Sequence, residues 1–118
     1  MTKGPLTLPA TAEVSLLHVA LALAPFAPRL EGDGSVRVSG VRQDSRRVEP
    51  GDLFVARAGE KTSGLDFVPE ALRRGAAALL VEQGVDARVF GVPVLEVRDV
   101  RRALGTAAER VYGWPSRA

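Results

Sequence analysis

Two short polar stretches of the chain carry side chains suited to binding a polar ligand. They are Asp44-Ser45-Arg46 and Glu60-Lys61-Thr62-Ser63. The second offers a carboxylate, an ammonium and two hydroxyl groups. Glycines on either side of it free backbone amides to face a ligand, which suits a nucleotide base or a phosphate. Each stretch also has a plainer interpretation, a local side-chain turn for the first and an ordinary polar surface loop for the second.

The chain contains none of the motifs that would complete a catalytic site around these stretches. It has no cysteine, which excludes a zinc ribbon, a thiol nucleophile and a disulfide. It has no glycine-rich phosphate loop and no dinucleotide-binding glycine motif. His18 is the only histidine, and its place among apolar residues indicates a structural role. We therefore expect a binding function, with no catalytic residue, metal ligand or cofactor in this segment.

Composition and charge indicate one small globular domain. Of 118 residues, 46% are hydrophobic and 25% are charged, which is ordinary for a soluble globular domain and unlike a disordered chain. The formal net charge is only +2, and arginine pairs such as Arg46-Arg47 and Arg101-Arg102 never extend to a run of five or six like charges. We interpret these pairs as solvated surface and expect no nucleic-acid partner.

The apolar stretch at residues 14–26 has two interpretations. It resembles the core of a signal peptide, but it is shorter than the roughly 20 apolar residues that cross a bilayer, and Lys3 is the only base before it. We therefore expect a core helix, in a cytoplasmic protein with no membrane partner. This helix is expected to have its N-cap at Thr11 and to end at Pro25. Its expected apolar face consists of Val14, Leu17, His18, Leu21 and Ala24.

The middle of the chain shows strand patterns separated by turn signals. Val36 and Val38 alternate with polar residues, which predicts a strand over residues 35–43 after a turn at residues 28–34. Pro50-Gly51 suits the central positions of a type II turn, where glycine accepts a positive φ. The apolar residues that follow this turn, 53–56, predict a strand that is covered on both faces.

The second half of the chain alternates helices and strands. The predicted elements are a helix over residues 66–75, a buried strand over 76–81, a strand over 92–97 and a helix between Asp99 and Gly113. Asp66 and Asp99 are the expected N-caps, and Gly75 is expected to end the first helix. The strand, helix, strand order predicts parallel pairing. The fold class is therefore α/β, a single small domain with a mixed, mainly parallel sheet flanked by helices.

A spacing problem separates the two polar stretches. Only residues 46–52 connect Ser45 to the next strand, too few for an ordinary parallel crossover. A simple antiparallel pairing would place Ser45 and the loop at residues 57–64 at opposite ends of the sheet. Spacing along the sequence therefore leaves open whether the two stretches meet.

The residues around both stretches resemble the N-terminal domain of Mur ligases. Residues 41–56, VRQDSRRVEPGDLFVA, resemble the family signature D-S-R-x-V-x-P-G-D-L-F-V-A. The resemblance continues through residues 59–64, 66–72, 75–78 and 92–94 to the Y-G-W-P-S ending at 112–116. Within the family, D-S-R and this ending look most like the member that adds the third residue of the peptide. The member that adds D-Ala-D-Ala more often has D-T-R.

The resemblance implies a substrate-binding role. In the family, the N-terminal domain holds the UDP part of UDP-N-acetylmuramoyl-L-Ala-D-Glu. The central domain binds ATP and magnesium, and the C-terminal domain receives the incoming meso-diaminopimelate or lysine. The D-Glu carboxylate becomes an acyl phosphate, which the amine attacks to form an amide. Carried over by position, the UDP contacts would be Gln43, Ser45, Glu60, Lys61 and Thr62, with Glu60 acting through its backbone amide because its carboxylate would repel a diphosphate.

The resemblance also implies how the chain divides. Residues 1–35 are expected to be a lead-in and core helix, residues 36–113 the UDP-binding α/β core, and residues 114–118 the start of a linker to the central domain. A short irregular crossover at residues 46–50 would bring the two polar stretches together. The segment alone is expected to be inactive, because the bond-making residues would lie in the other domains. The alternative is a stand-alone, non-catalytic nucleotide-sugar-binding or interaction module.

Overall fold

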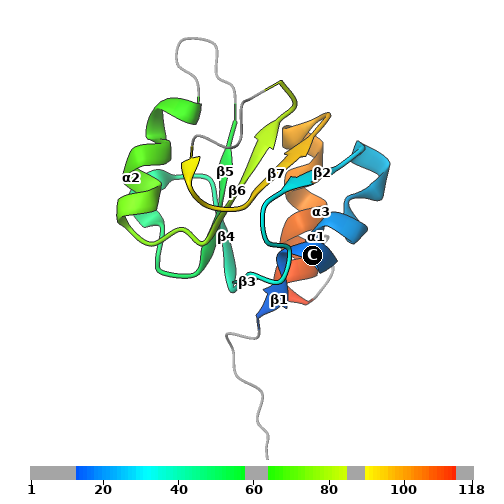
Figure 1. Ribbon diagram of the computed structural model, residues 1–118, viewed down its shortest axis with the longest axis horizontal. Coiled ribbons are helices and arrows are strands. Elements are labelled where there is room, and N and C mark those ends of the chain that lie inside the picture. The colour runs from blue at the N-terminus through cyan, green and yellow to red at the C-terminus, as the bar shows by residue number, and fades with distance from the viewer. Residues whose placement is uncertain (1–12, 58–63, 85–89, 114–118) are drawn as a thin grey trace, which may run out of the picture.

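The computed structural model, which describes residues 13–57, 64–84 and 90–113, has a central sheet with helices on both of its faces (Figure 1). The helices are α1 (Leu16–Ala22), α2 (Val68–Arg73) and α3 (Val100–Tyr112). The strands are β1 (Val14–Ser15), β2 (Arg29–Glu31), β3 (Arg37–Val38), β4 (Gly40–Arg42), β5 (Asp52–Ala56), β6 (Ala78–Glu82) and β7 (Val94–Val97). Among the described residues, 3-10 turns lie at Ala24–Phe26, Ser45–Arg47 and Gly64–Phe67.

The central sheet is mixed and mainly parallel, as the sequence predicts. Among the described residues its strand order is β2-β7-β6-β5-β4, and β4, β5, β6 and β7 all run parallel to one another. Strand β2 pairs with β7 in the antiparallel sense at one edge, and β4 forms the other edge. The short strands β1 and β3 pair separately, below this sheet in the view of Figure 1.

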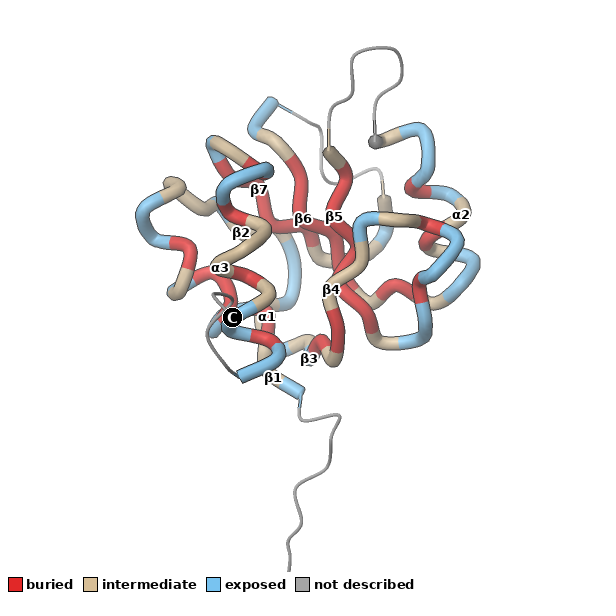
Figure 2. Tube along the Cα trace, turned by 180° about the vertical axis from the view of Figure 1, so that it is seen from behind, coloured by how far each residue is buried: buried red, intermediate tan, exposed pale blue. Residues whose placement is uncertain are grey.

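The core has two parts because apolar side chains leave both faces of the sheet. Leu53 and Val55 of β5 join a cluster with α1 and α3, whereas Phe54 and Ala56 join a cluster with α2. All five residues of β5 are buried, and the innermost strands form the red centre of Figure 2. Burying a side chain the size of leucine or phenylalanine contributes roughly 1.5–3 kcal/mol. The continuous apolar run at 53–56 therefore predicts this two-sided burial correctly.

The predicted helices around β6 and β7 are confirmed, with one cap corrected. Asp99 caps α3, since its Oδ1 accepts a hydrogen bond from the amide of Arg102 at 3.1 Å, and Gly113 ends this helix at a φ of +84°. The predicted cap of α2 at Asp66 is wrong, because that residue lies inside a 3-10 turn and Phe67 takes the N-cap position without a side-chain bond.

The first helix starts at a later residue than predicted and buries a different side. Residue Thr11 lies outside the described residues, and the N-cap is Ser15, whose Oγ accepts from the amide of His18 at 3.2 Å. Val14 and the cap residue Ser15 pair with β3 as β1, which sets where the helix begins and which side it buries. Leu17 and Leu21 are 50% and 65% exposed as a result.

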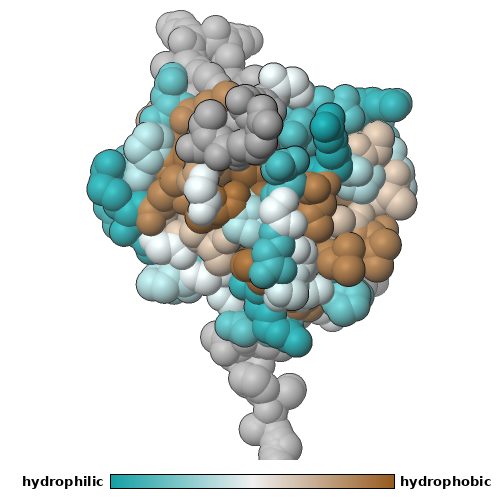
Figure 3. Space-filling model, viewed as in Figure 1, coloured by the Kyte–Doolittle hydropathy of each residue, from teal (hydrophilic) through white to brown (hydrophobic). Residues whose placement is uncertain are grey.

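The buried positions of this helix region are Leu16, Val19, Ala20 and Leu23, so the predicted apolar face is wrong. Figure 3 shows hydrophobic surface on the side of the molecule where α1 lies, consistent with the two exposed leucines. Among the described residues, no helix is both long and apolar enough to cross a membrane.

The predicted strand over residues 35–43 is two strands in two different sheets. The chain leaves β3 at Ser39, whose amide donates to the carbonyl of Gly51 at 3.0 Å, and enters β4 at Gly40. The predicted turn at residues 28–34 contains strand β2. Strands of two or three residues carry too few alternations for a sequence pattern to separate them.

The link from β4 to β5 is a parallel crossover made by residues 43–51 alone. Its last part is the predicted Pro50-Gly51 turn, which the amide of Asp52 closes on the carbonyl of Glu49 at 3.0 Å, with Gly51 at a φ of +93°. The buried Asp52 carboxylate accepts from the amide of Glu49 at 2.8 Å and from Nε of Arg42 at 3.0 Å. These bonds join the turn to β4.

The C-terminal end of α3 is fastened to the same strand. The hydroxyl of Tyr112 accepts from the amide of Val41 at 2.9 Å and donates to its carbonyl at 3.2 Å. Both backbone groups of Val41 therefore point away from β5 toward the helix. Strand β4 is thus held from both sides, by the crossover and by α3.

We expect Gly40→Ala to lower the free energy of unfolding by about 1–3 kcal/mol, the usual cost of overpacking a buried site. A Cβ at Gly40 would lie 2.6 Å from Oδ1 of Asp52, so the carboxylate would have to leave its place in the crossover. Denaturation by urea measures the change.

Gly105→Ala is the matched control, because a Cβ at this position in α3 meets nothing within 4 Å. Alanine at a helix interior should raise the free energy of unfolding by roughly 0.5–1 kcal/mol. Equal effects of the two substitutions would contradict the role given to Gly40.

Candidate functional site

The candidate site lies where β4 and β5 end. Because these strands are parallel, their carboxyl ends meet at one edge of the sheet, and open α/β sheets bind ligands beyond such ends. Nη1 of Arg57, which directly follows β5, donates to Oε1 of Gln43, which directly follows β4, at 2.7 Å. The short crossover therefore brings the turn after β4 beside the first residue of the loop after β5, whereas Glu60-Lys61-Thr62-Ser63 lie outside the described residues.

The turn after β4 is organised by its own side chains. Oδ1 of Asp44 accepts from the amide of Arg46 at 3.0 Å and from its Nε at 3.1 Å, and Oδ2 accepts from its Nη2 at 3.0 Å. The side-chain bond from Arg46, and then its backbone bond, hold the pKa of Asp44 below its ordinary value. The plainer interpretation of this stretch, a local turn capped by an aspartate, is confirmed for Asp44.

Ser45 has a different role from its neighbours, because it connects the turn to α2. Its side chain is buried, with only 5% of the residue exposed, and its Oγ donates to Oε1 of Glu70 at 2.9 Å. Nε and Nη2 of Arg74 bind Oε2 of the same carboxylate at 3.3 and 3.2 Å. The Ser45 hydrogen bond, followed by the Arg74 bond and charge, lowers the pKa of Glu70 from its ordinary value of 4.5.

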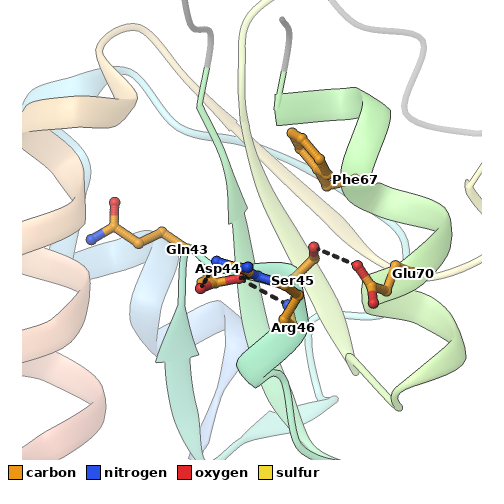
Figure 4. Close-up of a pocket in the computed structure, with 6 residues that line it drawn as sticks. All are labelled: Gln43, Asp44, Ser45, Arg46, Phe67 and Glu70. Carbon is orange, nitrogen blue, oxygen red and sulfur yellow. Dashed lines mark hydrogen bonds and ion pairs between the residues drawn. The ribbon is translucent and has the colours of Figure 1, made fainter.

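These groups line a surface pocket of about 360 Å³, a volume within the range of small-ligand sites. Its lining residues are Gln43, Asp44, Ser45, Arg46, Phe67 and Glu70. Figure 4 shows Ser45 and Glu70 pointing toward each other, with Phe67 on the same side of the strand ends. The side chain of Gln43 points away from this group, toward the other face of the sheet. The pocket therefore offers an aromatic surface beside a hydroxyl and a carboxylate.

Of the five predicted contact residues, Gln43 and Ser45 lie at this edge, and Glu60, Lys61 and Thr62 lie outside the described residues. Sequence reasoning missed three other side chains at the site, those of Arg57, Phe67 and Glu70. The sequence predicts only that Phe67 and Glu70 lie in a helix, and their spacing of three residues is the one signal that they share a face.

A metal centre is not formed by the described residues. Among them, no cluster of three or more His, Cys, Asp or Glu side chains could hold an ion. The acidic side chains of the pocket are instead paired with arginines close to them in sequence, Asp44 with Arg46 and Glu70 with Arg74.

A family model described as "Mur ligase family, catalytic domain" matches residues 37–112. The sequence is also similar to two UDP-N-acetylmuramoyl-L-alanyl-D-glutamate–2,6-diaminopimelate ligases. The enzyme from Rhizobium meliloti is 44% identical over 89 residues, 75% of this chain and 18% of the relative. The enzyme from Streptomyces coelicolor is 44% identical over 87 residues, 72% of this chain and 17% of the relative. This chain thus spans less than a fifth of the length of these relatives.

The fold is similar to that of a solved structure of MurF, a different enzyme from the two relatives above. The crystal structure of MurF from Acinetobacter baumannii matches 84% of this chain and 21% of its own chain, with a TM-score of 0.67 and 25% sequence identity. The expected fold class, a small α/β domain with a mixed, mainly parallel sheet, is therefore found in a known structure as well.

We expect the contact between the Ser45 turn and α2 to weaken in acid. Because the pKa of Glu70 is lowered in the folded state, its contribution to stability is complete above pH 4.5 and is lost as the pH falls through the folded-state pKa. Circular dichroism measures the melting temperatures of the wild type and of Glu70→Gln between pH 7 and pH 3. The two melting temperatures should differ most at pH 7 and least at pH 3.

Glu31→Gln is the control, because it removes a carboxylate at the opposite edge of the sheet without changing the Ser45 turn or α2. If the difference in melting temperature between the wild type and Glu70→Gln stayed the same from pH 7 to pH 3, the role of the ionised carboxylate would be contradicted.

Proposed function

Because this chain belongs to the Mur ligase family, we propose that it is an N-terminal domain that holds the UDP part of UDP-N-acetylmuramoyl-L-alanyl-D-glutamate. The parent protein is then an ATP-dependent ligase of peptidoglycan precursor synthesis that works in the cytoplasm. In this proposal the segment binds the substrate and catalyses nothing by itself. ATP and magnesium belong to the central domain, and the incoming amino acid to the C-terminal domain.

The parallel pairing of β4 and β5 is the observation that supports this proposal best. It places the turn at Ser45 and the start of the loop after β5 at one edge, where the 2.7 Å bond between Arg57 and Gln43 joins them. A ligand that bridges two loops needs such a shared edge. The pocket of about 360 Å³ beside Ser45 is large enough for one part of a nucleotide.

The proposed contact residues are Gln43, Ser45, Glu60, Lys61 and Thr62. Ser45 lines the pocket directly, and the amide group of Gln43 is oriented by Arg57, which can donate only to its oxygen. Its nitrogen is therefore left to donate to a part of the ligand that lies on the side of the strand ends away from Ser45. Glu60, Lys61 and Thr62 remain predictions from the family resemblance, with Glu60 contributing its backbone amide.

The proposed reaction is the addition of the third residue of the peptide. An acyl phosphate forms on the D-Glu carboxylate, and the amine of the incoming amino acid attacks it to form an amide. Both curated relatives described above are named for 2,6-diaminopimelate, which favours this amino acid over lysine. This segment contributes by keeping the UDP end of the substrate in place while the chemistry occurs at the far end.

The stand-alone binding module is the second candidate, and the coding sequence beyond Ala118 separates the two. A glycine-rich loop containing Gly-Lys-Thr within a few dozen residues supports the ligase. A stop codon directly after Ala118 supports the module. A nucleotide-sugar-binding module would also bind a uridine nucleotide, whereas a pure interaction module would not, so the binding test below separates the latter from the ligase.

We expect Ser45→Ala to weaken binding of UDP-N-acetylmuramoyl-dipeptide by about 1 kcal/mol, or roughly fivefold, the net value of a neutral hydrogen bond. Isothermal titration calorimetry measures the affinity. Ser35→Ala is the control, because the hydroxyl of Ser35 binds Asp33 in an exposed turn away from this edge. Unchanged affinity of Ser45→Ala would remove Ser45 from the site, and no binding by the wild type would reject the proposed function.

A further inference from the structure

The hydroxyl proton of Ser45 already has a partner within the protein. It is donated to Oε1 of Glu70 at 2.9 Å, from a side chain that is almost fully buried. A hydroxyl has one proton to donate and two lone pairs with which to accept. In this arrangement Ser45 therefore presents an acceptor, and no donor, to the pocket.

The charge of Glu70 determines the direction of this hydrogen bond. Oε2 of the carboxylate is bound by two nitrogens of Arg74, while Oε1 receives the Ser45 proton. The pKa of Glu70 is lowered by Ser45 first and by Arg74 second, so the group is ionised at neutral pH. An ionised carboxylate only accepts hydrogen bonds, and so Ser45 must be the donor of this pair.

The surroundings of Ser45 suit a nucleoside better than a phosphate. Phe67 lines the same pocket with 46% of its surface exposed, and an aromatic ring of this kind can stack on a base. The carboxylate of Glu70 would repel a phosphate placed against Ser45. The half-buried Arg57 follows the neighbouring strand β5, and its guanidinium would attract a negatively charged part of the ligand placed there.

We propose that Glu70 sets the hydrogen-bonding polarity of Ser45, so that this point of the site recognises a hydrogen-bond donor of a uridine nucleotide. The donor is the N–H of the base or a hydroxyl of the ribose, and a phosphate oxygen is excluded. The inference rests on the proposed function, because it concerns how the same site distinguishes the parts of its ligand. Glu70 is then a positioning residue, which acts on the ligand through Ser45.

Glu70→Gln separates this role from simple packing of the turn on α2. The amide has the same shape as the carboxylate, but it has one oxygen and one nitrogen. The charged Arg74 binds the oxygen, which leaves the amide nitrogen facing Ser45. Ser45 then accepts from the amide, and its own proton turns toward the pocket. The polarity of the site is reversed without loss of volume, whereas a packing defect would weaken all ligands alike.

The test measures calorimetric affinities of the purified protein for UDP and three analogues. The analogues are 3-methyl-UDP, which lacks the base N–H, 2′-deoxy-UDP and 3′-deoxy-UDP, which each lack one ribose hydroxyl. We expect the wild type to bind one of them about tenfold more weakly than UDP, because a buried acceptor loses its partner. The analogue affected identifies the donor. In Glu70→Gln the difference should fall to about twofold or less.

Two further variants complete the test. Glu31→Gln makes the same chemical change in β2, at the opposite edge of the sheet from Ser45, and should keep the tenfold difference. Ser45→Ala removes the acceptor and should also abolish the difference, which provides a second measurement if Glu70→Gln does not fold. Circular dichroism checks the fold of each variant.

The outcomes distinguish this inference from the proposed function. A wild type that binds UDP and all three analogues equally overturns the inference and leaves the proposed function intact. A folded Glu70→Gln variant that keeps the tenfold difference also overturns it, as does a Ser45→Ala variant that keeps it. A wild type that does not bind UDP rejects the proposed function and the inference together.

Discussion

The buried carboxylate of Asp52 holds together the crossover on which both the sheet and the candidate site depend. It binds the amide of Glu49 within the turn and Nε of Arg42 in the neighbouring strand. Parallel strands are usually joined by a dozen residues or more, often a helix that satisfies its own backbone. The crossover at residues 43–51 is shorter and irregular, so its polar groups need partners from side chains. Asp52 supplies such a partner for the amide of Glu49 and links the turn to Arg42 of β4.

Arginines around the site act mainly on acidic neighbours. Arg46 pairs with Asp44 and Arg74 pairs with Glu70, and the side chains of both arginines are at least 45% exposed. Exposed pairs of this kind add little to stability. Their effect is to orient carboxylates, and through Glu70 to orient the hydroxyl of Ser45. The net charge of the chain therefore does not show that acidic and basic side chains are paired locally around the site.

The parts of the fold that sequence reasoning predicted correctly depend on local signals. The Pro50-Gly51 turn, the Asp99 cap and the buried strand at residues 53–56 are each determined by residues within one or two turns of chain. The side that α1 buries was predicted wrongly because pairing of β1 with β3, more than 20 residues away, decides it. The Ser45–Glu70 bond spans 25 residues and depends on how a 3-10 turn packs on α2, which no sequence pattern records.

The hydroxyl of Tyr112 has a consequence for the behaviour of the protein among other copies of itself. Strand β4 lies at an edge of the sheet, and free backbone groups on such an edge invite a strand from another molecule to add to it. The hydroxyl occupies both outward groups of Val41, the middle residue of this three-residue strand. Intermolecular strand addition, a common start of aggregation, is thereby blocked at this edge by one side chain.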